Sequence, residues 1–343
     1  MKKVIVTGGL GFIGSNLIEY LIGKNYFVIN IDKSSYSANP YNLKHFKKKK
    51  YVFYKIDIGN KKKLYQILKK YRPIGIFNLA AETHVDRSID DSKNFIKSNI
   101  IGVYNILEVL RKIKKEKRTN IKLLHVSTDE VYGDLKSSQN ASESFNYNPS
   151  SPYSASKASA DQLIKAYIRT YGIKSTIVNS CNNYGPNQFP EKFIPKIIFN
   201  LLNNKSIPVY GKGNNLREWI YVKDNCEALY KIFKKGKIGE NYNVGTGIRL
   251  RNIDLVRMIL SIAQKKNISL RNKNKILYVK DRPGHDKRYA LDSYKIIKNL
   301  KWKPKTSFSD GIKKTFKWYL NNQKYYKSLK KKDIVERLGK IND

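Results

Sequence analysis

The sequence predicts an α/β protein in which a doubly wound parallel sheet is followed by a smaller C-terminal substrate-binding lobe. Strands that are apolar along their whole length alternate with amphipathic helices in the first half of the chain, as in sheets that helices cover on both faces. A glycine-rich turn joins the first strand to the first helix, and the alternation stops after Val178. We therefore expect one domain over 1–178, to which the chain returns around 219–247, and a second lobe over 179–330.

The turn after the first strand has the composition of a dinucleotide-binding loop. Gly8, Gly11 and Gly14 follow Val4–Val6 and precede a helix with one apolar face. Glycines at these points allow a tight turn, a close approach of a pyrophosphate to the backbone, and packing of the helix on the strand. The spacing G-x-x-G-x-x-G is one residue longer than the commonest form. Strand, turn and helix in this order indicate a Rossmann-type domain.

Acidic residues end the next two strands. Asp32 directly follows Phe27–Ile31, where a carboxylate would accept hydrogen bonds from the adenosine ribose and repel a 2′-phosphate. NAD is therefore favoured over NADP, although Lys33 weakens the preference. Asp57 ends the third strand and is a candidate partner of the adenine amino group. A fourth strand, residues 74–81, ends in small residues that would let a cofactor lie close to the backbone.

The fifth strand, 121–126, leads into the stretch that carries the chemistry, Ser127–Gly133. Thr128, Asp129 and Glu130 sit where this strand ends, and open α/β sheets bind ligands at the carboxyl ends of their strands. Two neighbouring acids at this place can act as general acid and general base. Taken alone, the pattern is also typical of a polar loop with acids facing water.

A serine followed by Pro152 predicts a helix start. Tyr153 then lies in the first turn, and Lys157 lies one turn later on the same face. A cation beside a phenol favours the tyrosinate, so we expect the pKa of Tyr153 to lie below its usual value of about 10, which suits a base that removes a hydroxyl proton. The same spacing recurs elsewhere in the chain, so only the position after Thr128 selects this pair.

Composition and charge exclude some classes of protein. With 343 residues, 41% of them hydrophobic, the chain can form the cores of two lobes. No stretch has the apolar length of a signal peptide or membrane span, so we expect a cytoplasmic protein without a membrane partner. Cys181 and Cys226 form no ligand pattern with the four histidines, so we expect no metal site.

The formal net charge of +41 leaves two interpretations open. It could mark a nucleic-acid-binding surface. The lysines are spread over the whole chain with only short runs, which favours a solvated basic surface and no nucleic-acid partner. A basic surface also attracts an anionic substrate. In the second lobe, Arg217 and Arg282 are candidate clamps for the diphosphate of a sugar nucleotide, although each alone is typical of a surface residue.

With these motifs in this order, the chain resembles the extended short-chain dehydrogenase/reductases of the sugar-nucleotide epimerase/dehydratase family. More narrowly, it resembles the members that dehydrate dTDP-glucose. The resemblance runs from residue 1 to about residue 320. Its distinctive stretches are 80–88, 127–133, 152–161, 182–195 and 281–289.

The resemblance implies a lyase with tightly bound NAD, acting in dTDP-rhamnose biosynthesis. Tyr153, helped by Lys157 and Thr128, would take the C4 hydroxyl proton of dTDP-glucose while a hydride passes to NAD. Glu130 would then remove the C5 proton, while Asp129, kept protonated, donates to the departing C6 hydroxyl. The hydride would return to C6, giving dTDP-4-keto-6-deoxyglucose and water.

The resemblance also implies the binding residues and a homodimer formed by helices over about 95–115 and 153–171. The cofactor set is Gly8, Gly11, Phe12, Ile13, Gly14, Asp32, Lys33, Ser34, Ser35, Asp57, Ile58, Leu79, Ala80, Ala81, Thr83, Ser98, Tyr153, Lys157 and Asn183. The substrate set is Thr83, Thr128, Asn182, Lys192, Phe193, Pro208, Val209, Tyr210, Arg217, Asn252, Asp281, Arg282, Pro283, Gly284 and His285.

Two departures from the family pattern leave the acid–base set untouched. Ser180 and Cys181 stand in the reverse of the usual order, and Thr83 stands where serine is common. Alternative functions are another NAD-dependent sugar-nucleotide 4,6-dehydratase, decarboxylase or epimerase of the same family, and a non-catalytic NAD-sensing protein. The decarboxylases resemble this chain but have serine where Asp129 stands, since they protonate no leaving hydroxyl.

Overall fold

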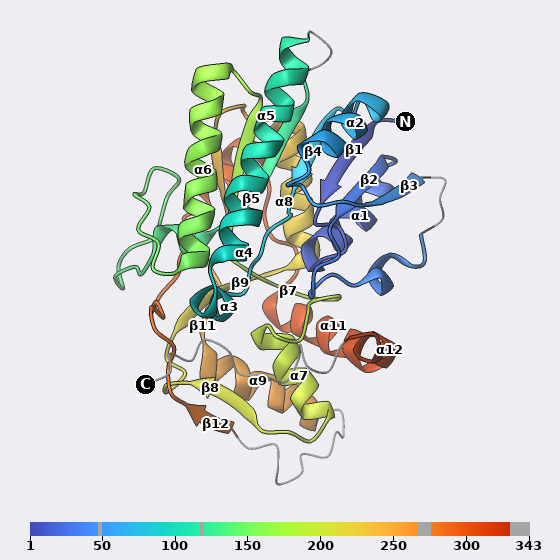
Figure 1. Cartoon of the computed structure of the whole chain (residues 1–343). Helices are drawn as coiled ribbons and strands as arrows, with labels where there is room; N and C mark the ends of the chain where they lie inside the picture. Colours follow the sequence, from blue (N-terminus) through green and yellow to red (C-terminus); the bar gives the residue numbers. More distant parts are fainter. Residues whose placement is uncertain (47–49, 117–119, 266–275, 330–343) are drawn as a thin grey trace.

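A computed structural model describes residues 1–46, 50–116, 120–265 and 276–329 (Figure 1). Its main feature is a seven-stranded sheet of order β10-β6-β5-β4-β1-β2-β3, in which every pairing is parallel. The direction of strand addition reverses between β1 and β4, and ligands bind at such a switch point. The strands are β1 (Lys3–Thr7), β2 (Phe27–Asp32), β3 (Tyr51–Lys55), β4 (Gly75–Asn78), β5 (Lys122–Thr128), β6 (Ser175–Ser180) and β10 (Asn241–Val244).

Helices cover both faces of this sheet, which confirms the predicted doubly wound architecture (Figure 1). Apolar side chains of three helices share one core with the first face, and those of three others share a second core with the opposite face. The strands are apolar along their length because both of their faces are buried. The first group is α1 (Phe12–Gly23), α8 (Val222–Lys235) and α10 (Tyr294–Leu300), and the second is α2 (Lys61–Tyr71), α5 (Gly102–Lys115) and α6 (Pro152–Tyr171).

The remaining elements form a smaller lobe with a core of its own (Figure 1). Its strands make a three-stranded sheet, β11-β9-β7, and a two-stranded sheet, β12-β8. We propose two lobes on this basis, with α8 and β10 belonging to the first. The elements are β7 (Asn182–Tyr184), β8 (Ile207–Tyr210), β9 (Leu216–Tyr221), β11 (Arg249–Arg251), β12 (Ile276–Val279), α7 (Phe193–Leu202), α9 (Asn252–Gln264), α11 (Phe308–Asn321) and α12 (Gln323–Lys327).

Short segments near the switch point differ from the prediction. β4 ends at Asn78, so residues 79–81 lie beyond the strand, although the N–H of Leu79 still donates to the carbonyl oxygen of Thr7 at 3.2 Å. The helix expected from residue 95 starts as α4 (Lys93–Phe95) and a π-helical segment, η3 (Ile96–Ile101), before α5 begins. Such π-helical turns are frequent at functional sites. Further short helices are η1 (Pro40–Leu43), α3 (Val85–Asp90) and η4 (Asp129–Tyr132).

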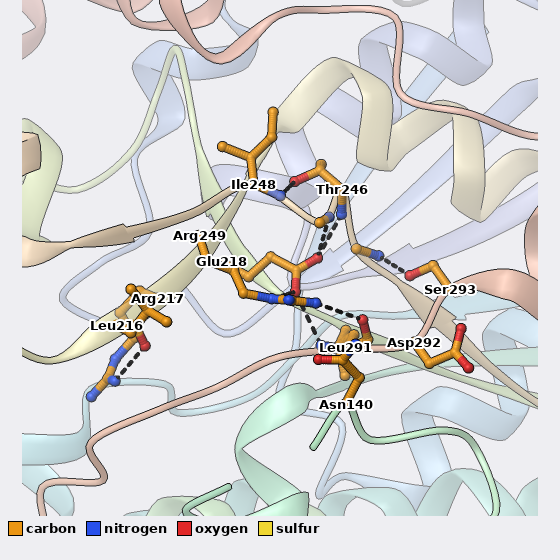
Figure 2. Close-up of polar contacts among 12 residues, drawn as sticks. Asn140, Leu216, Arg217, Glu218, Thr246, Ile248, Arg249, Leu291, Asp292 and Ser293 are labelled. Carbon is orange, nitrogen blue, oxygen red and sulfur yellow. Dashed lines mark hydrogen bonds and ion pairs between the residues drawn. The ribbon is translucent and has the colours of Figure 1, made fainter. Parts of the chain in front are cut away.

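The fully buried carboxylate of Glu218 on β9 joins three segments of the chain (Figure 2). Its Oε1 accepts from the backbone N–H groups of Thr246 and Gly247, at 2.7 and 2.8 Å. Its Oε2 accepts from the N–H of Leu291 at 3.0 Å and from Arg249 Nε at 3.4 Å. Because all of these donors point at one buried charge, Glu218 holds β9 against the turn after β10 and the strand-like segment before α10.

No helix within the described ranges combines the length and the apolar character needed to span a bilayer.

Replacing Glu218 with Gln should therefore destabilise the fold. One amide NH₂ would face donors in place of an oxygen, and Arg249 would lose its anionic partner, so we expect the free energy of unfolding to fall by about 2 to 4 kcal/mol. Urea unfolding followed by circular dichroism measures this change. The exposed ion pair of Arg251 and Asp254 supplies the control, since Asp254→Asn should cost less than about 1 kcal/mol. Equal effects of the two substitutions would contradict the account.

Candidate active site

Two adjoining cavities lie at the carboxyl ends of the parallel strands. The first runs from the glycine-rich turn to the end of β6, and the second lies between α3, α7, β8 and β12 of the smaller lobe. Together they form a continuous site because five residues line both: Thr83, Glu130, Asn182, Glu191 and Lys192. Glu130 therefore lies where contents of the two cavities would meet.

The glycine-rich turn in the first cavity has no room for side chains. Gly8 has φ +70°, and a Cβ on it would lie 2.8 Å from the backbone nitrogen of Ala80. A Cβ on Gly14 would collide with the carbonyl oxygen of Gly8. Helix α1 begins behind this turn with no side-chain cap on its N-cap residue, Gly11, and no acid in its first turn. Its first N–H groups and its dipole are thus available to a diphosphate.

Asp32 is held in place by the same turn. Its Oδ2 accepts from the N–H of Leu10 at 2.9 Å, and its Oδ1 accepts from the N–H of Ser34 at 2.7 Å. Each carboxylate oxygen keeps a second lone pair for a ribose hydroxyl. Lys33 points its Nζ at Glu82 Oε1, 2.8 Å away, and at Ser98 Oγ, also 2.8 Å away. Because Glu82 pairs with its charge, Lys33 is poorly placed to attract a 2′-phosphate.

The structure brings the predicted cofactor set together with one exception. Ser34 is absent from the lining of the first cavity, because its backbone adopts φ +60° and the chain turns there. All other members of the set line the cavity. The prediction missed further residues that line the cavity. Those at the end of β6 could have been predicted, because β6 lies beside β5 in the sheet. The missed residues are Ile31, Ser37, Ala38, Ile56, Val126, Ser127, Ser180, Cys181, Gln188, Phe189 and Glu191.

Asp129 and Glu130 lie at the end of β5 in the turn of η4, with Thr128 as the N-cap. The Thr128 hydroxyl accepts from the N–H of Glu130 at 3.3 Å and donates to Asp129 Oδ1 at 3.2 Å. Asp129 is 3% exposed, and its buried Oδ2 finds no hydrogen-bond partner in the part of the chain that the structure describes. Burial, helped by the charge of Glu130, raises the pKa of Asp129 well above its usual range.

Glu130 has a different environment from its neighbour. Burial raises its pKa as well, and Arg282, Arg217 and Lys192 offset this rise only in part. The pKa values of the two carboxyl groups therefore differ. Asp129 favours the neutral acid, and Glu130 has three nearby cations that stabilise its anion. Environments that separate two carboxyl groups in this way define an acid and a base.

The expectation that Lys157 lowers the pKa of Tyr153 is wrong for this structure. Burial and the charge of Glu130 raise the pKa of Tyr153, and a hydrogen bond with Thr128 only partly offsets them. Lys157 Nζ instead donates to the carbonyl oxygen of Val126 at 2.8 Å and lies 3.3 Å from His125 Nε2. Its own pKa is lowered to about 8, because burial disfavours the ammonium ion. Both side chains nevertheless line the first cavity, as predicted.

The second cavity is rich in cations. Arg217 is 5% exposed and donates through Nη2 to the carbonyl oxygen of Asp286 at 2.7 Å. Arg282 pairs through Nη1 with Asp86 Oδ1 at 2.7 Å, and Asp86 Oδ2 accepts from the Tyr210 hydroxyl at 2.7 Å. The Nε of Arg282 is buried and has no partner among the described residues, so it remains available to an anion.

Most of the predicted substrate set lines the second cavity, namely Thr83, Asn182, Lys192, Phe193, Pro208, Tyr210, Arg217, Asn252, Arg282 and His285. Thr128 lines the first cavity. The side chain of Val209 does not line the second cavity: side chains alternate along β8, so Pro208 and Tyr210 face the cavity while Val209 packs in the core of the smaller lobe.

Three further members of the predicted set do not reach the second cavity. Asp281, Pro283 and Gly284 lie in an exposed turn and are absent from its lining. Asp281 Oδ1 lies 2.6 Å from His285 Nδ1, so it positions a lining residue instead. Within the described chain, no three His, Cys, Asp or Glu side chains are grouped as metal ligands.

Comparison with known proteins places this site in a family. The family model described as GDP-mannose 4,6 dehydratase matches residues 5–315. The chain belongs to this GDP-mannose 4,6 dehydratase family. It is similar to "dTDP-glucose 4,6-dehydratase" of Haemophilus influenzae (45% identical, covering 94% of this chain and 99% of the relative). It is also similar to "dTDP-glucose 4,6-dehydratase 1" of Escherichia coli K12 (43% identical, 96% and 95%).

Solved structures of the same class agree in fold. The crystal structure of dTDP-glucose 4,6-dehydratase from Bacillus anthracis in complex with NAD is 38% identical, with a TM-score of 0.86 over 96% of this chain and 100% of that one. The enzyme DesIV from Streptomyces venezuelae, named dTDP-glucose 4,6-dehydratase, is 37% identical, with a TM-score of 0.89 and the same coverage. A UDP-glucose 4-epimerase from Thermotoga maritima is also similar, at 28% identity and a TM-score of 0.84 over 94% of this chain and 99% of that one. The fold thus spans several sugar-nucleotide reactions, and residues of the site must distinguish them.

The raised pKa of Asp129 predicts that this carboxyl group lowers the stability of the folded protein at neutral pH. A carboxyl group whose pKa is higher in the folded state loses stability as pH rises from the unfolded to the folded pKa. Asp129→Asn removes that loss, so the variant should melt about 1 to 3 °C higher than the native protein at pH 7.5. The difference should shrink as the pH falls below about 3.9, where the carboxyl is protonated in the unfolded state as well as in the folded state. A melting difference that is constant between these pH values would contradict the assignment.

Proposed function

We propose that this protein is a dTDP-glucose 4,6-dehydratase, a lyase that converts dTDP-glucose to dTDP-4-keto-6-deoxyglucose and water with bound NAD. The observation that carries the proposal is the buried carboxyl group of Asp129, whose pKa is raised well above its usual range, beside Glu130, which has three cations near it at the junction of two cavities. Relatives 42 to 45% identical over nearly the whole chain carry this name, which supports the choice of substrate.

The first cavity fits NAD because its turn admits only backbone beside a diphosphate and its Asp32 carboxylate is fixed toward the ribose position. Gly8, Gly14 and the N-terminus of α1 would hold the diphosphate, and Asp32 would hold the adenosine ribose. When bound, NAD supplies an acceptor for a hydride that is later returned. Cys181 and Cys226 are buried thiols without a disulfide, which fits a reducing cytoplasm.

Tyr153 is the group that takes the proton of the C4 hydroxyl. Interaction with the Thr128 side chain lowers the pKa of Tyr153, and the charge of Glu130 raises it. Proton removal at C4 is therefore favoured once the bound sugar hydrogen-bonds to the Glu130 carboxylate, which stays anionic for the next step. In this way the first proton transfer depends on correct binding of the substrate.

The elimination step needs an acid and a base on neighbouring atoms of the sugar. Oxidation at C4 acidifies the C5 proton, which the Glu130 carboxylate removes. Asp129 is neutral because it is buried, so it can donate its proton to the departing C6 hydroxyl. Arg217 and Arg282 hold the diphosphate in the second cavity, which brings the sugar to Glu130 at the junction.

A simple 4-epimerase of the same fold needs no acid for a leaving hydroxyl, and the buried Asp129 therefore favours dehydration. The decisive experiment uses dTDP-glucose deuterated at C4, followed by mass spectrometry of the product. We expect loss of one water with the deuterium retained at C6. Product that keeps its oxygen, or that loses the deuterium to solvent, would contradict the proposal.

The roles of the two carboxyl groups predict a specific pattern in variants. Glu130→Gln and Asp129→Asn should each lower kcat for dehydration by at least about 100-fold, because proton transfer by a positioned group contributes about that much. NAD content after purification should be unchanged, since the turn around Gly8 and Gly14 is untouched. Ser159→Ala, on the exposed face of α6, is the control and should retain full activity. Full turnover in either carboxyl variant would remove its assigned role.

We also propose that the protein is a homodimer that pairs through η3, α5 and α6. Large apolar side chains are exposed on these helices: Ile96 and Ile101 by 49% and 48%, Tyr104 by 39% and Tyr171 by 40%. Exposed apolar side chains that share a surface are typical of an interface.

A charge placed among these side chains should separate the subunits. Ile101→Glu should convert a dimer to a monomer in size-exclusion chromatography with light scattering, because an unpaired charge would be buried in the interface. Tyr294→Glu is the matched control, since Tyr294 is 62% exposed but lies on α10, on the opposite face of the sheet. A dimer that survives Ile101→Glu would exclude this interface.

A further inference from the structure

A buried polar chain runs from β1 to Lys157 and has no part in the mechanism above. Ala80 donates its backbone N–H to the Thr7 hydroxyl at 3.2 Å, and that hydroxyl donates to Asn78 Oδ1 at 2.6 Å. The amide nitrogen of Asn78 lies 2.9 Å from His125 Nδ1. Thr7, Asn78 and His125 are all at most 1% exposed, so water cannot replace a missing partner.

This chain selects one tautomer of His125. The amide of Asn78 can only donate to Nδ1 if that nitrogen carries no hydrogen, so the hydrogen of the neutral ring lies on Nε2. The reverse orientation of the Asn78 amide would leave the buried Thr7 hydroxyl without an acceptor, which is unfavourable in a site without water. The ring is neutral because burial lowers the pKa of His125 far below its usual value, and the charge of Lys157 adds to this effect.

The Nε2–H of His125 faces Lys157 Nζ at 3.3 Å and Asp161 Oδ1 at 3.7 Å. A neutral amine has a lone pair that accepts this hydrogen, whereas an ammonium ion has none. Contact with His125 thus favours the uncharged form of Lys157. Asp161 acts in the opposite sense, because its carboxylate is fully buried on the same helix, one turn after Lys157.

Asp161 is itself fixed from two other elements. Its Oδ2 accepts from Ser127 Oγ at 2.7 Å and from the Tyr147 hydroxyl at 3.0 Å, while no described residue hydrogen-bonds its Oδ1. Lys165 is a more distant cation that also acts on it. Asp161 and His125 are the titratable groups that act on Lys157, since Glu130 and Asp129 act on Tyr153 instead.

We propose that His125 and Asp161 are opposed positioning residues that act through Lys157, the imidazole stabilising its neutral amine and the carboxylate its ammonium ion. Together they set the pH at which the lysine beside Tyr153 changes charge. The consequence for catalysis rests on the proposed function, but the charge state of Lys157 is a property of the protein alone.

The test follows the side-chain carbon next to Nζ of Lys157 by NMR during a pH titration of the full-length protein labelled with ¹³C-lysine. Lys157→Met identifies the signal by its loss. We expect its midpoint to rise by about one pH unit in His125→Phe and to fall by a similar amount in Asp161→Asn, because each change removes one of two opposed partners. Ser159→Ala should leave the midpoint unchanged.

A second, remote variant tests the tautomer. Thr7→Val keeps the shape of the side chain but removes the hydroxyl, so the amide of Asn78 is free to turn over. His125 can then carry its hydrogen on Nδ1, and its Nε2, without a hydrogen, can accept from the ammonium ion of Lys157. The midpoint should rise, although Thr7 does not touch Lys157, and this readout serves if His125→Phe fails to fold. An unchanged midpoint in Thr7→Val, or shifts of the same sign in His125→Phe and Asp161→Asn, would overturn the proposal. Because the titration needs no substrate, it distinguishes this failure from a failure of the proposed reaction.

Discussion

Desolvation of two adjacent carboxyl groups at the end of β5 is the constraint on which the rest of the site depends. In water, Asp129 and Glu130 would both ionise at neutral pH. Burial raises the pKa of both carboxyl groups, and positive charge from the second lobe opposes this more strongly at Glu130, where Arg282, Arg217 and Lys192 act, than at Asp129, where Arg217 acts. The difference between the acid and the base therefore depends on residues from both parts of the chain.

Two further buried acids, Glu218 and Asp86, support this division. Glu218 holds β9, which carries Arg217, and its own negative charge further raises the pKa of Asp129. Asp86 orients Arg282 at the edge of the second cavity in a similar way. Glu218 and Asp86 thus help to position Arg217 and Arg282, and Glu218 also favours the protonated form of Asp129.

The parts of this account that the sequence predicts are local. The glycine-rich turn, the acid after β2 and the Thr128–Glu130 stretch each combine a strand end with a residue type, and alternation of strands and helices gives the sheet. The failures concern contacts across long separations. Spacing in α6 put Lys157 beside Tyr153, but it could not show that His125 and Asp161 engage the lysine or that Glu130 acts on the phenol.

Other failures come from backbone geometry. Val209 was included in the substrate set together with its neighbours Pro208 and Tyr210. Because side chains alternate along β8, its side chain points into the core instead of the cavity. Asp86 lies within a distinctive motif, but its ion pair with Arg282 joins residues that are 196 positions apart. No periodicity within one segment reveals such a pair.

The most direct measurement of the central claim is the protonation state of Asp129 in the resting protein. Infrared difference spectroscopy at neutral pH between the native protein and Asp129→Asn detects the carbonyl stretch of a protonated carboxyl. The account predicts this band in the native protein, its loss in Asp129→Asn, and its retention in Glu130→Gln. Its absence from the native protein, with carboxylate bands for both residues, would contradict the assignment of Asp129 as the acid.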